Sequence, residues 1–382
     1  MRYTIGQLAE IIDGDRGKNY PKQDEFYPQG YCLFLNTGNV TKEGLIFEEN
    51  QFITKEKDEA LRKGKLKRGD IVYTTRGTVG NAGYYNSNVP YENVRINSGM
   101  VILRANGEIV DARFLYQILK SEYYRPYFKQ YCTGSAQPQL PIKNFSQIYL
   151  NVPDIKTQRH IADILSAYDD LIENNQKQIK LLEEAAQRVY KEWFVDLRFP
   201  GHENTKIVDG VPEGWSRGLL KELISVNYGK DHKKAPDDGN IPVYGSGGLM
   251  RKCNKSLFSG EAVLIPRKGS LNNIMYVDET FWTVDTMFYA TMKQPNTAVF
   301  VYFFVKAFDM YSMNIGAAVP SMTAKILDAM DVVIPDKETL EKFDKRAKVY
   351  FNKIKTLQGQ NERLKTARDL LLPKLMSGEV EV

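Results

Sequence analysis

A regular spacing of apolar residues between Asp154 and Arg198 constrains the fold of this 382-residue chain more than any other feature. Apolar or small residues, with Asn175 filling one gap, alternate at intervals of four and three: Ile161, Leu165, Tyr168, Ile172, Ile179, Leu182, Ala186, Val189 and Trp193. Such a heptad seam, about four and a half heptads long, predicts a long helix that packs along another helix. The alternative is a surface helix on a globular core, but such helices average only roughly 11–12 residues.

A second seam in the same register follows 182 residues later. It comprises Phe343, Ala347, Tyr350, Ile354, Leu357, Asn361, Leu364, Arg368, Leu371 and Leu375. The same offset relates 134–138 to 316–320 and 148–153 to 330–335, so the chain is predicted to be a tandem repeat. In each repeat, a globular region of roughly 150 residues ends at a proline that opens a long helix. Asn175 and Asn361 either fix the register of the two helices or lie at exposed seam ends.

Length and composition are those of an ordinary soluble protein with two or three domains, and the repeat narrows this to two domains plus a shared helical element. The sequence has no apolar run of the ~20 residues that a membrane helix needs and no signal-peptide core, so we expect a cytoplasmic protein. Cys32, Cys132 and Cys253 form no CxxC pair, which argues against a disulfide framework and a thiolate zinc site. With a net charge of only +5, a nucleic-acid binder must concentrate its positive charge on one face.

Each globular region reads as a mixed α+β domain. The first is predicted to contain a short helix at 5–12, strands at 31–35, 71–73 and 100–103, and an aromatic-rich helix at 112–131. The second follows a linker at 200–214 and repeats the plan, with 67–72 matching 258–263 at an offset of 191. Similar frames with different loops favour two recognition devices aimed at two targets, because loops usually carry binding specificity. Duplication without division of labour is the alternative.

Sequence signatures of catalysis and cofactor binding are missing. There is no GxxxxGK[ST] phosphate loop and no GxSxG nucleophile elbow, and 245–248 reads as a turn because Met250 occupies the place of a third glycine. The three histidines lack metal-ligand companions, so no metal site and no catalytic residue are predicted. Asp336, with Glu341 and Lys342, is interpreted as a helix start, where acidic residues favour the positive end of the dipole.

The positive signals are two matching basic motifs. Residues 76–81 (RGTVGN) follow the predicted strand at Ile71, and residues 267–272 (RKGSLN) follow a strand at Val263, which places Arg76 and Arg267 at an offset of 191. Arginine donates paired hydrogen bonds to guanine or phosphate, and glycine allows close backbone approach, so the motifs predict DNA contact; an ordinary basic hairpin is the alternative. The candidate DNA-binding residues are Lys65, Lys67, Arg68, Arg76, Gly77, Thr78, Asn81, Asn97 and Gln137 in the first region, and Lys233, Lys234, Tyr244, Ser246, Arg267, Lys268, Ser270 and Asn272 in the second.

Taken together, these features resemble the DNA-specificity subunit of type I restriction-modification systems. The resemblance covers almost the whole chain and rests on the repeated architecture and on the pattern Gly-Ser-x-x-Pro at 134–138, an apolar strand, and then Pro153 and Gln158 opening the helix. The family often has Glu-Gln where this chain has Thr157-Gln158, and the second half departs further with Thr339-Leu340.

The resemblance implies an α+β fold in which two tandem mixed α/β target-recognition domains are joined by two long antiparallel coiled-coil helices with pseudo-twofold symmetry. The domains are expected at 1–153 and 200–335, and the spacer helices at 154–199 and 336–378. It implies a non-catalytic subunit in which each domain reads half of a bipartite DNA target. Helix length would set the spacer between the halves, because an α-helix rises ~1.5 Å per residue.

The resemblance also implies partners. The helices are expected to bind two methyltransferase subunits and, through them, restriction/translocase subunits, with S-adenosylmethionine, ATP and magnesium on those partners and no cofactor in this chain. Two other readings stay open at this point. One is a homodimeric coiled-coil scaffold, and the other is a complete DNA methyltransferase or nuclease whose motif is not evident.

Overall fold

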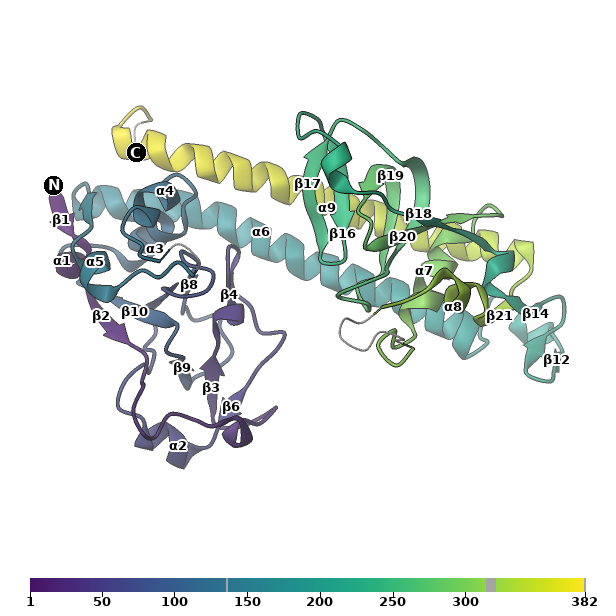
Figure 1. Cartoon of the computed structure of the whole chain (residues 1–382), viewed down its shortest axis with the longest axis horizontal. Helices are drawn as coiled ribbons and strands as arrows, with labels where there is room; N and C mark the ends of the chain where they lie inside the picture. The colour runs from purple at the N-terminus through teal and green to yellow at the C-terminus, as the bar shows by residue number, and fades with distance from the viewer. Residues whose placement is uncertain (135–136, 314–320, 381–382) are drawn as a thin grey trace. The chain divides into compact units, whose positions relative to one another are not determined.

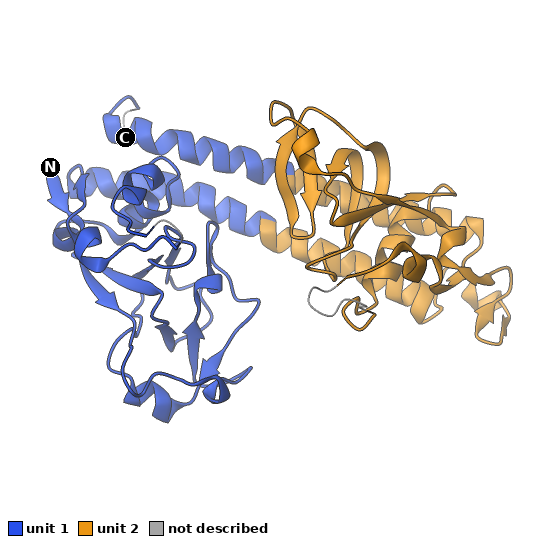
Figure 2. Cartoon of the chain, in the orientation of Figure 1, with its two compact units in different colours: residues 1–175, 359–382 blue, residues 176–358 orange. Residues whose placement is uncertain are grey.

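The structure, a computed structural model, describes residues 1–134, 137–313 and 321–380. The chain forms two compact units: unit 1 is Met1–Asn175 with Gly359–Val382, and unit 2 is Gln176–Gln358 (Figure 2). Each unit combines one globular α+β region with part of each of two long helices (Figure 1). Because this division cuts both helices, the predicted domain boundaries at 153, 199 and 335 stay predictions.

The two long helices are α6 (Ile155–Tyr190), continued by the π-helical segment η3 (Lys191–Val195), and α9 (Lys337–Ser377). An aspartate caps each start: Asp154 accepts hydrogen bonds from two backbone N–H groups, and Asp336 accepts one from Thr339 N at 2.9 Å. These bonds satisfy donors that the first helical turn leaves unpaired. The interpretation of Asp336 as part of a helix start is confirmed.

The predicted seams pack against each other within each unit. In unit 1, Ile161 and Leu165 of α6 share a core with Leu372 and Leu375 of α9, while Asn175 contacts Asn361. Early residues of α6 therefore meet late residues of α9, so this pair is antiparallel. All the predicted seam positions are buried or half-buried, which confirms two long packed helices.

The helix pair in unit 2 has the same sense. Near the start of α9, Phe343 lies 5.9 Å from Trp193, measured between ring centroids. Further along α9, Phe351 lines a small cavity together with Lys180 and Glu183, which come earlier in α6. Later residues of α9 thus meet earlier residues of α6 here as well.

The globular region of unit 1 is built on a four-stranded antiparallel sheet in the order β2-β10-β7-β8. Its strands are β2 (Ala9–Asp13), β7 (Ile71–Thr74), β8 (Ala82–Tyr84) and β10 (Met100–Ala105). A three-stranded sheet contains β3 (Cys32–Leu35), β6 (Phe52–Ile53) and β9 (Val94–Ile96), and two-stranded pairs join β1 (Arg2–Thr4) to β11 (Tyr149–Asn151) and β4 (Val40–Thr41) to β5 (Gly44–Leu45). The three predicted strands are confirmed by β3, β7 and β10.

Two helix predictions in unit 1 are partly wrong. The expected helix at 5–12 ends early, as α1 (Ile5–Leu8), because residues 9–13 form β2 and pair with β10. The expected helix at 112–131 is divided into α3 (Ala112–Lys120) and α4 (Arg125–Lys129). Between them, Ser121 leaves the helical conformation and its hydroxyl accepts a hydrogen bond from Tyr123 N, as serine often does at turns.

The remaining helices of unit 1 are α2 (Lys55–Ala60), α5 (Ile142–Ser146) and the 3₁₀ segments η1 (Gln23–Glu25) and η2 (Thr37–Asn39). Side chains alternate along a strand, and successive residues of the central strands enter two different cores, so these strands are buried on both faces. Ile71 and Tyr73 of β7 pack with α3 and the long helices, whereas Val72 packs into the core that contains β3 and β9.

Unit 2 repeats this plan with a six-stranded sheet in the order β15-β20-β18-β19-β16-β17. The strands are β15 (Ile224–Tyr228), β16 (Ile241–Gly245), β17 (Gly248–Cys253), β18 (Phe258–Pro266), β19 (Met275–Thr283) and β20 (Met287–Met292). All pairs are antiparallel except β16 with β19. Val263 and Ile265 of β18 face the core beside the long helices, and Ala262 and Leu264 face a second core, so this strand is also buried on both sides.

Smaller elements complete unit 2. They are the pairs β12 (Ile207–Val208) with β13 (Val211–Pro212) and β14 (Ser216–Leu219) with β21 (Asp331–Ile334), the helices α7 (Ala298–Lys306) and α8 (Ala324–Asp328), and the 3₁₀ segments η4 (His202–Asn204), η5 (Leu220–Glu222) and η6 (His232–Lys234). The predicted linker at 200–214 thus contains a small hairpin. Across the described ranges, the structure contains no helix long and apolar enough to span a membrane.

Candidate nucleic-acid interface

The first basic motif forms an outward turn directly after β7. The backbone N–H groups of Thr75 and Arg76 both donate to the carbonyl of Gly99, which immediately precedes β10, at 2.9 and 3.1 Å. On the other side, Leu140 N donates to Thr75 O at 2.9 Å, and Arg76 forms a β-bridge with Gln139. The turn is therefore held by backbone bonds on two sides, and the side chain of Arg76 is exposed.

Residues within this turn divide into exposed and buried groups. Gly77 has φ +70°, a left-handed conformation that favours glycine, and Thr78 is exposed. Asn81, in contrast, is only 5% exposed, and its Nδ2 donates to Val40 O at 2.9 Å. The prediction of Asn81 as a DNA contact is therefore at odds with the structure, because the side chain supports the turn from inside the protein.

The second basic motif has the same backbone pattern. Arg267 N and Lys268 N donate to the carbonyl of Thr286, which precedes β20, at 2.8 and 3.2 Å. Met322 N donates to Arg267 O at 2.9 Å, and Lys268 forms a β-bridge with Ser321. These are the bonds of the first motif, repeated strand for strand.

The backbone pattern corrects the alignment made from the sequence. Arg267 makes the bonds that Thr75 makes in the first motif, and Lys268 makes those of Arg76. The two turns are therefore related by an offset of 192 residues, and the structural counterpart of Arg76 is Lys268. The offset of 191 matched two identical letters that occupy different positions in the fold.

Three further features support the corrected alignment. Gly77 and Gly269 both have positive φ, +70° and +85°, and each glycine carbonyl accepts a backbone hydrogen bond from the residue two positions on, at 3.1 and 2.9 Å. Each glycine precedes an exposed hydroxyl residue, Thr78 or Ser270. We call residues 76–78 the first basic turn and residues 268–270 the second basic turn. Both present a cation, a glycine and a hydroxyl in that order.

The cations of the two basic turns are less engaged by the described residues than Arg267 is. Among the residues that the structure describes, the guanidinium of Arg76 and the ammonium of Lys268 have no hydrogen bond or ion pair. Arg267 is more engaged, because its guanidinium lies 5.4 Å from the ring centroid of Tyr228 and approaches Asp285 O at 3.4 Å. Free cations beside a hydroxyl and an exposed backbone are suited to phosphates and to the acceptor edges of bases.

Other predicted residues of unit 1 lie beside the first basic turn. Asn97 Oδ1 accepts a hydrogen bond from Gly99 N at 2.9 Å and thereby shapes the loop that receives the turn. Gln137 is exposed in the loop that Thr133 and Gln139 close by mutual backbone bonds of 2.7 and 2.9 Å. Residues 135–136 of this predicted motif and its counterpart at 316–320 lie outside the described residues.

Predicted residues of unit 2 gather less completely. Ser246 O accepts a hydrogen bond from Asn273 Nδ2 at 2.8 Å, which places the β16–β17 turn beside the second basic turn, and Asn272 Nδ2 donates to Asp309 at 3.0 Å. The Tyr244 hydroxyl donates to Glu279, and burial together with that carboxylate raises the pKa of the phenol. Exposed Lys233 and Lys234, on η6, make no recorded contact with the second basic turn in the described ranges.

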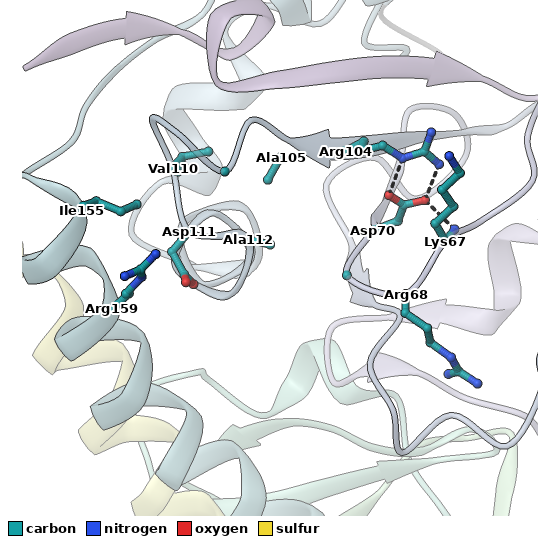
Figure 3. A pocket seen from close by; sticks show the side chains of 12 residues that line it. Lys67, Arg68, Asp70, Arg104, Ala105, Val110, Asp111, Ala112, Ile155 and Arg159 are labelled. Atoms are coloured by element: carbon teal, nitrogen blue, oxygen red, sulfur yellow. Dashed lines mark hydrogen bonds and ion pairs between the residues drawn. The ribbon is translucent and has the colours of Figure 1, made fainter.

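Lys67 and Arg68 are not brought to the first basic turn. They lie before β7, at the opposite end of that strand, where a cavity of about 330 Å³ opens (Figure 3). Asp70 in this cavity accepts two bonds from Arg104, at 3.0 and 2.8 Å, and one from Lys67 N. Arg68 points away from the cavity, and its guanidinium donates to the carbonyls of residues 86, 89 and 91.

Lys65 also has a structural environment. Its ammonium contacts Asp58 at 2.5 Å, and the same carboxylate binds the buried Arg95. The prediction of Lys65 and Arg68 as DNA contacts is therefore weakened by partners within the protein. Residues that the sequence analysis missed are Gln139 and Ser321, which bridge to the turns, although the offset of 182 relates them.

Comparison with known proteins agrees with this architecture. The model of a family described as the type I restriction modification DNA specificity domain matches residues 1–184 and 212–366. This match covers most of the chain, and the chain belongs to that family.

Individual relatives are similar over most of their length. The chain is 24% identical to the type I restriction enzyme HindI specificity subunit of Haemophilus influenzae, covering 98% of this chain and 100% of that protein. It is 25% identical to the MjaIX specificity subunit of Methanocaldococcus jannaschii, covering 85% and 81%. The crystal structure of the type I restriction-modification S subunit from M. genitalium has the same fold, with a TM-score of 0.56 at 18% identity over 98% of this chain and 95% of that one.

Proposed function

We propose that the chain is the subunit through which a type I restriction-modification complex recognises its DNA sequence, and that each basic turn contacts one half of a bipartite target. The chain is a specificity subunit, a non-catalytic component of such a system. The observation that carries the assignment of the turns is their shared backbone. An identical set of backbone bonds presents Arg76 in one unit and Lys268 in the other.

The physical argument for two separate readers rests on the side chains. Arginine donates two parallel bonds to guanine O6 and N7, whereas lysine is a point charge suited to a phosphate. The supporting residues also differ, since Gln139 bridges to the first turn and Ser321 to the second. Two turns with one backbone and different side chains favour two half-sites of different sequence.

The rival scaffold reading is not favoured. A homodimeric coiled coil through the predicted seams needs those seams to face another copy. In each unit, however, the seam of α6 is already buried against the seam of α9. We therefore place the interaction with two methyltransferase subunits, and through them with restriction/translocase subunits, on other surfaces of the chain. In this proposal S-adenosylmethionine, ATP and magnesium are held by those partners, and the complex acts in the cytoplasm.

The experiment is co-expression of the chain with its neighbouring methyltransferase, followed by mapping of methylated adenines by single-molecule sequencing. The wild type is expected to give a split motif with a fixed gap. Arg76→Ala should relax one half of the motif, because a good base contact supplies about 1–3 kcal/mol of discrimination. Lys268→Ala should weaken methylation through the other half.

Lys55→Ala serves as the control, since Lys55 is an exposed cation on α2 that is not among the candidate DNA-binding residues. It should leave the motif unchanged. If Arg76→Ala altered both halves equally, the assignment of one turn to one half-site would be wrong. A stable complex that methylates no DNA would contradict the proposed function and favour the scaffold reading.

A further inference from the structure

The tip of the β16–β17 hairpin is apolar and exposed. The strands pair from Ile241 with Cys253 to Gly245 with Gly248, so the turn residues lie at 246–247. Next to the turn, Leu249 is 59% exposed and Met250 is 55% exposed. Away from the tip the hairpin becomes buried, and Cys253 is fully covered. The hairpin therefore projects its apolar end away from the core.

The exposure of two consecutive residues is informative. The strand register shifts here, since Tyr244 pairs with Leu249 and Val243 pairs with Arg251, so Met250 is the unpaired residue of a bulge beside the tip. Leu249 and Met250 are both left exposed. Met250 lies over Gly245, where an added Cβ would approach its sulfur to 2.5 Å. The glycine therefore lets the methionine fold across the ribbon and keeps the tip narrow.

The hairpin tip adjoins the second basic turn. A Cβ on Gly269 would lie 2.8 Å from Ser246 Oγ, and Asn273 Nδ2 donates to Ser246 O. The hydroxyl of Tyr311 donates to Gly269 O at 3.3 Å from the other side. Lys268 therefore lies on the segment that touches the hairpin turn. Cationic and apolar groups are presented together at this end of unit 2.

We infer that the β16–β17 tip enters the major groove of the second half-site and that Leu249 and Met250 contact thymine methyl groups there. This inference rests on the proposed function and specifies which residues of unit 2 read bases. The major groove admits a two-stranded ribbon, and the thymine C5-methyl is the apolar group that distinguishes an A·T pair in it. Lys268 then anchors the neighbouring phosphate.

The composition of the surroundings favours DNA over a protein partner at this tip. Lys268 adjoins the tip. The residue before it, Arg267, has its guanidinium over the ring of Tyr228. The nearby acid Asp309 accepts hydrogen bonds at Oδ1 from Asn272 Nδ2 and from Tyr311 N. A cationic rim around a small apolar tip matches a phosphate-lined groove.

The test uses the complex of the full chain with its methyltransferase and duplexes that carry the mapped motif. Because a half-site methylated on adenine contains at least one A·T pair, thymines in the second half-site are replaced one at a time by deoxyuridine, which removes only the methyl group. Loss of one buried methyl should weaken wild-type binding about three- to fivefold at a contacted thymine. In Leu249→Ser or Met250→Ser, that difference should disappear at the corresponding position.

Two controls keep the outcome interpretable. Val208→Ser replaces a residue that is 64% exposed on β12, in another hairpin of unit 2, and should retain the full deoxyuridine effect. Met250→Leu keeps an apolar side chain and should retain it too. All variants are compared by thermal unfolding, and no shift is expected at such exposed positions.

The inference is overturned if both serine variants keep the wild-type motif and the wild-type response to deoxyuridine. It is also overturned if they lose the methyltransferase while the bound DNA sequence is unchanged, since the tip would then be a protein contact. A wild-type complex that shows no split motif contradicts the proposed function itself, so the two failures are distinguishable.

Discussion

Asn175 and Asn361 should be energetically coupled across the helix pair of unit 1. Their side chains are 8% and 6% exposed, and Asn175 Nδ2 donates to Asn361 Oδ1 at 2.8 Å. Replacing either one by leucine leaves the other amide buried without its partner, which costs about 1–3 kcal/mol. Replacing both removes the two polar groups together, which is close to neutral when the shapes fit.

The assay is a double-mutant cycle in which urea unfolding of the full chain is monitored by circular dichroism. Asn175→Leu and Asn361→Leu should each lower the free energy of unfolding by about 1–3 kcal/mol, and the double variant should recover at least ~1 kcal/mol of the sum. Asn174→Leu is the control, because its side chain is exposed on the same helix and its effect should be within ~0.5 kcal/mol. Strict additivity of the two buried substitutions would refute the reasoning.

Three other outcomes follow from single groups. Burial raises the pKa of Asp344 despite its ion pair with Lys348. The protonated side chain therefore contributes stability below the ordinary aspartate pKa of 3.8, and this stability is lost as the pH rises through the raised pKa. Asp344→Asn should raise the urea midpoint at pH 7 and change it little near pH 4. Burial raises the pKa of Asp169, but the nearby cations Lys120 and Arg368 outweigh burial and lower it overall. Arg368→Leu should therefore lower the free energy of unfolding by about 1–3 kcal/mol at pH 7, and this loss should shrink below pH 4 as the carboxylate becomes protonated. Lys268→Ala should reduce the slope of log affinity against log salt by about one, measured by fluorescence anisotropy on duplex DNA, whereas an unchanged slope would exclude a phosphate contact.

The long helices could be predicted because their signal is local and periodic. A seam residue must be apolar every three or four positions, so the pattern survives in the sequence whatever the globular regions do. The helix expected at 5–12 failed for the opposite reason. Ile11 and Ile12 are compatible with either element, and pairing with β10, far along the chain, decides in favour of a strand.

The candidate site could be predicted only in part, since letters carry no information on burial or on partners. In the sequence, Asn81 and Arg68 cannot be told apart from exposed polar residues that contact DNA. In the structure, Asn81 donates to the carbonyl of Val40, and Arg68 donates to three backbone carbonyls. The pairing of Arg76 with Arg267 failed because it matched two arginines by residue type, whereas the backbone places them one position apart. The bonds to Gly99 and Thr286, with the bridges to Gln139 and Ser321, show that Lys268 occupies the equivalent position.

The corrected pairing changes how the two halves of the target are read. Arg76 provides a planar fork that discriminates guanine, whereas Lys268 provides a charge that any phosphate satisfies. The second basic turn therefore supplies position more than sequence, and unit 2 needs base contacts from another element. The β16–β17 tip, held against Gly269 and carrying Leu249 and Met250, is such an element. On this reasoning the first half-site is selected mainly by hydrogen bonds from the basic turn and the second mainly by apolar contact beside it, so deoxyuridine should affect binding at the second half-site and not at the first.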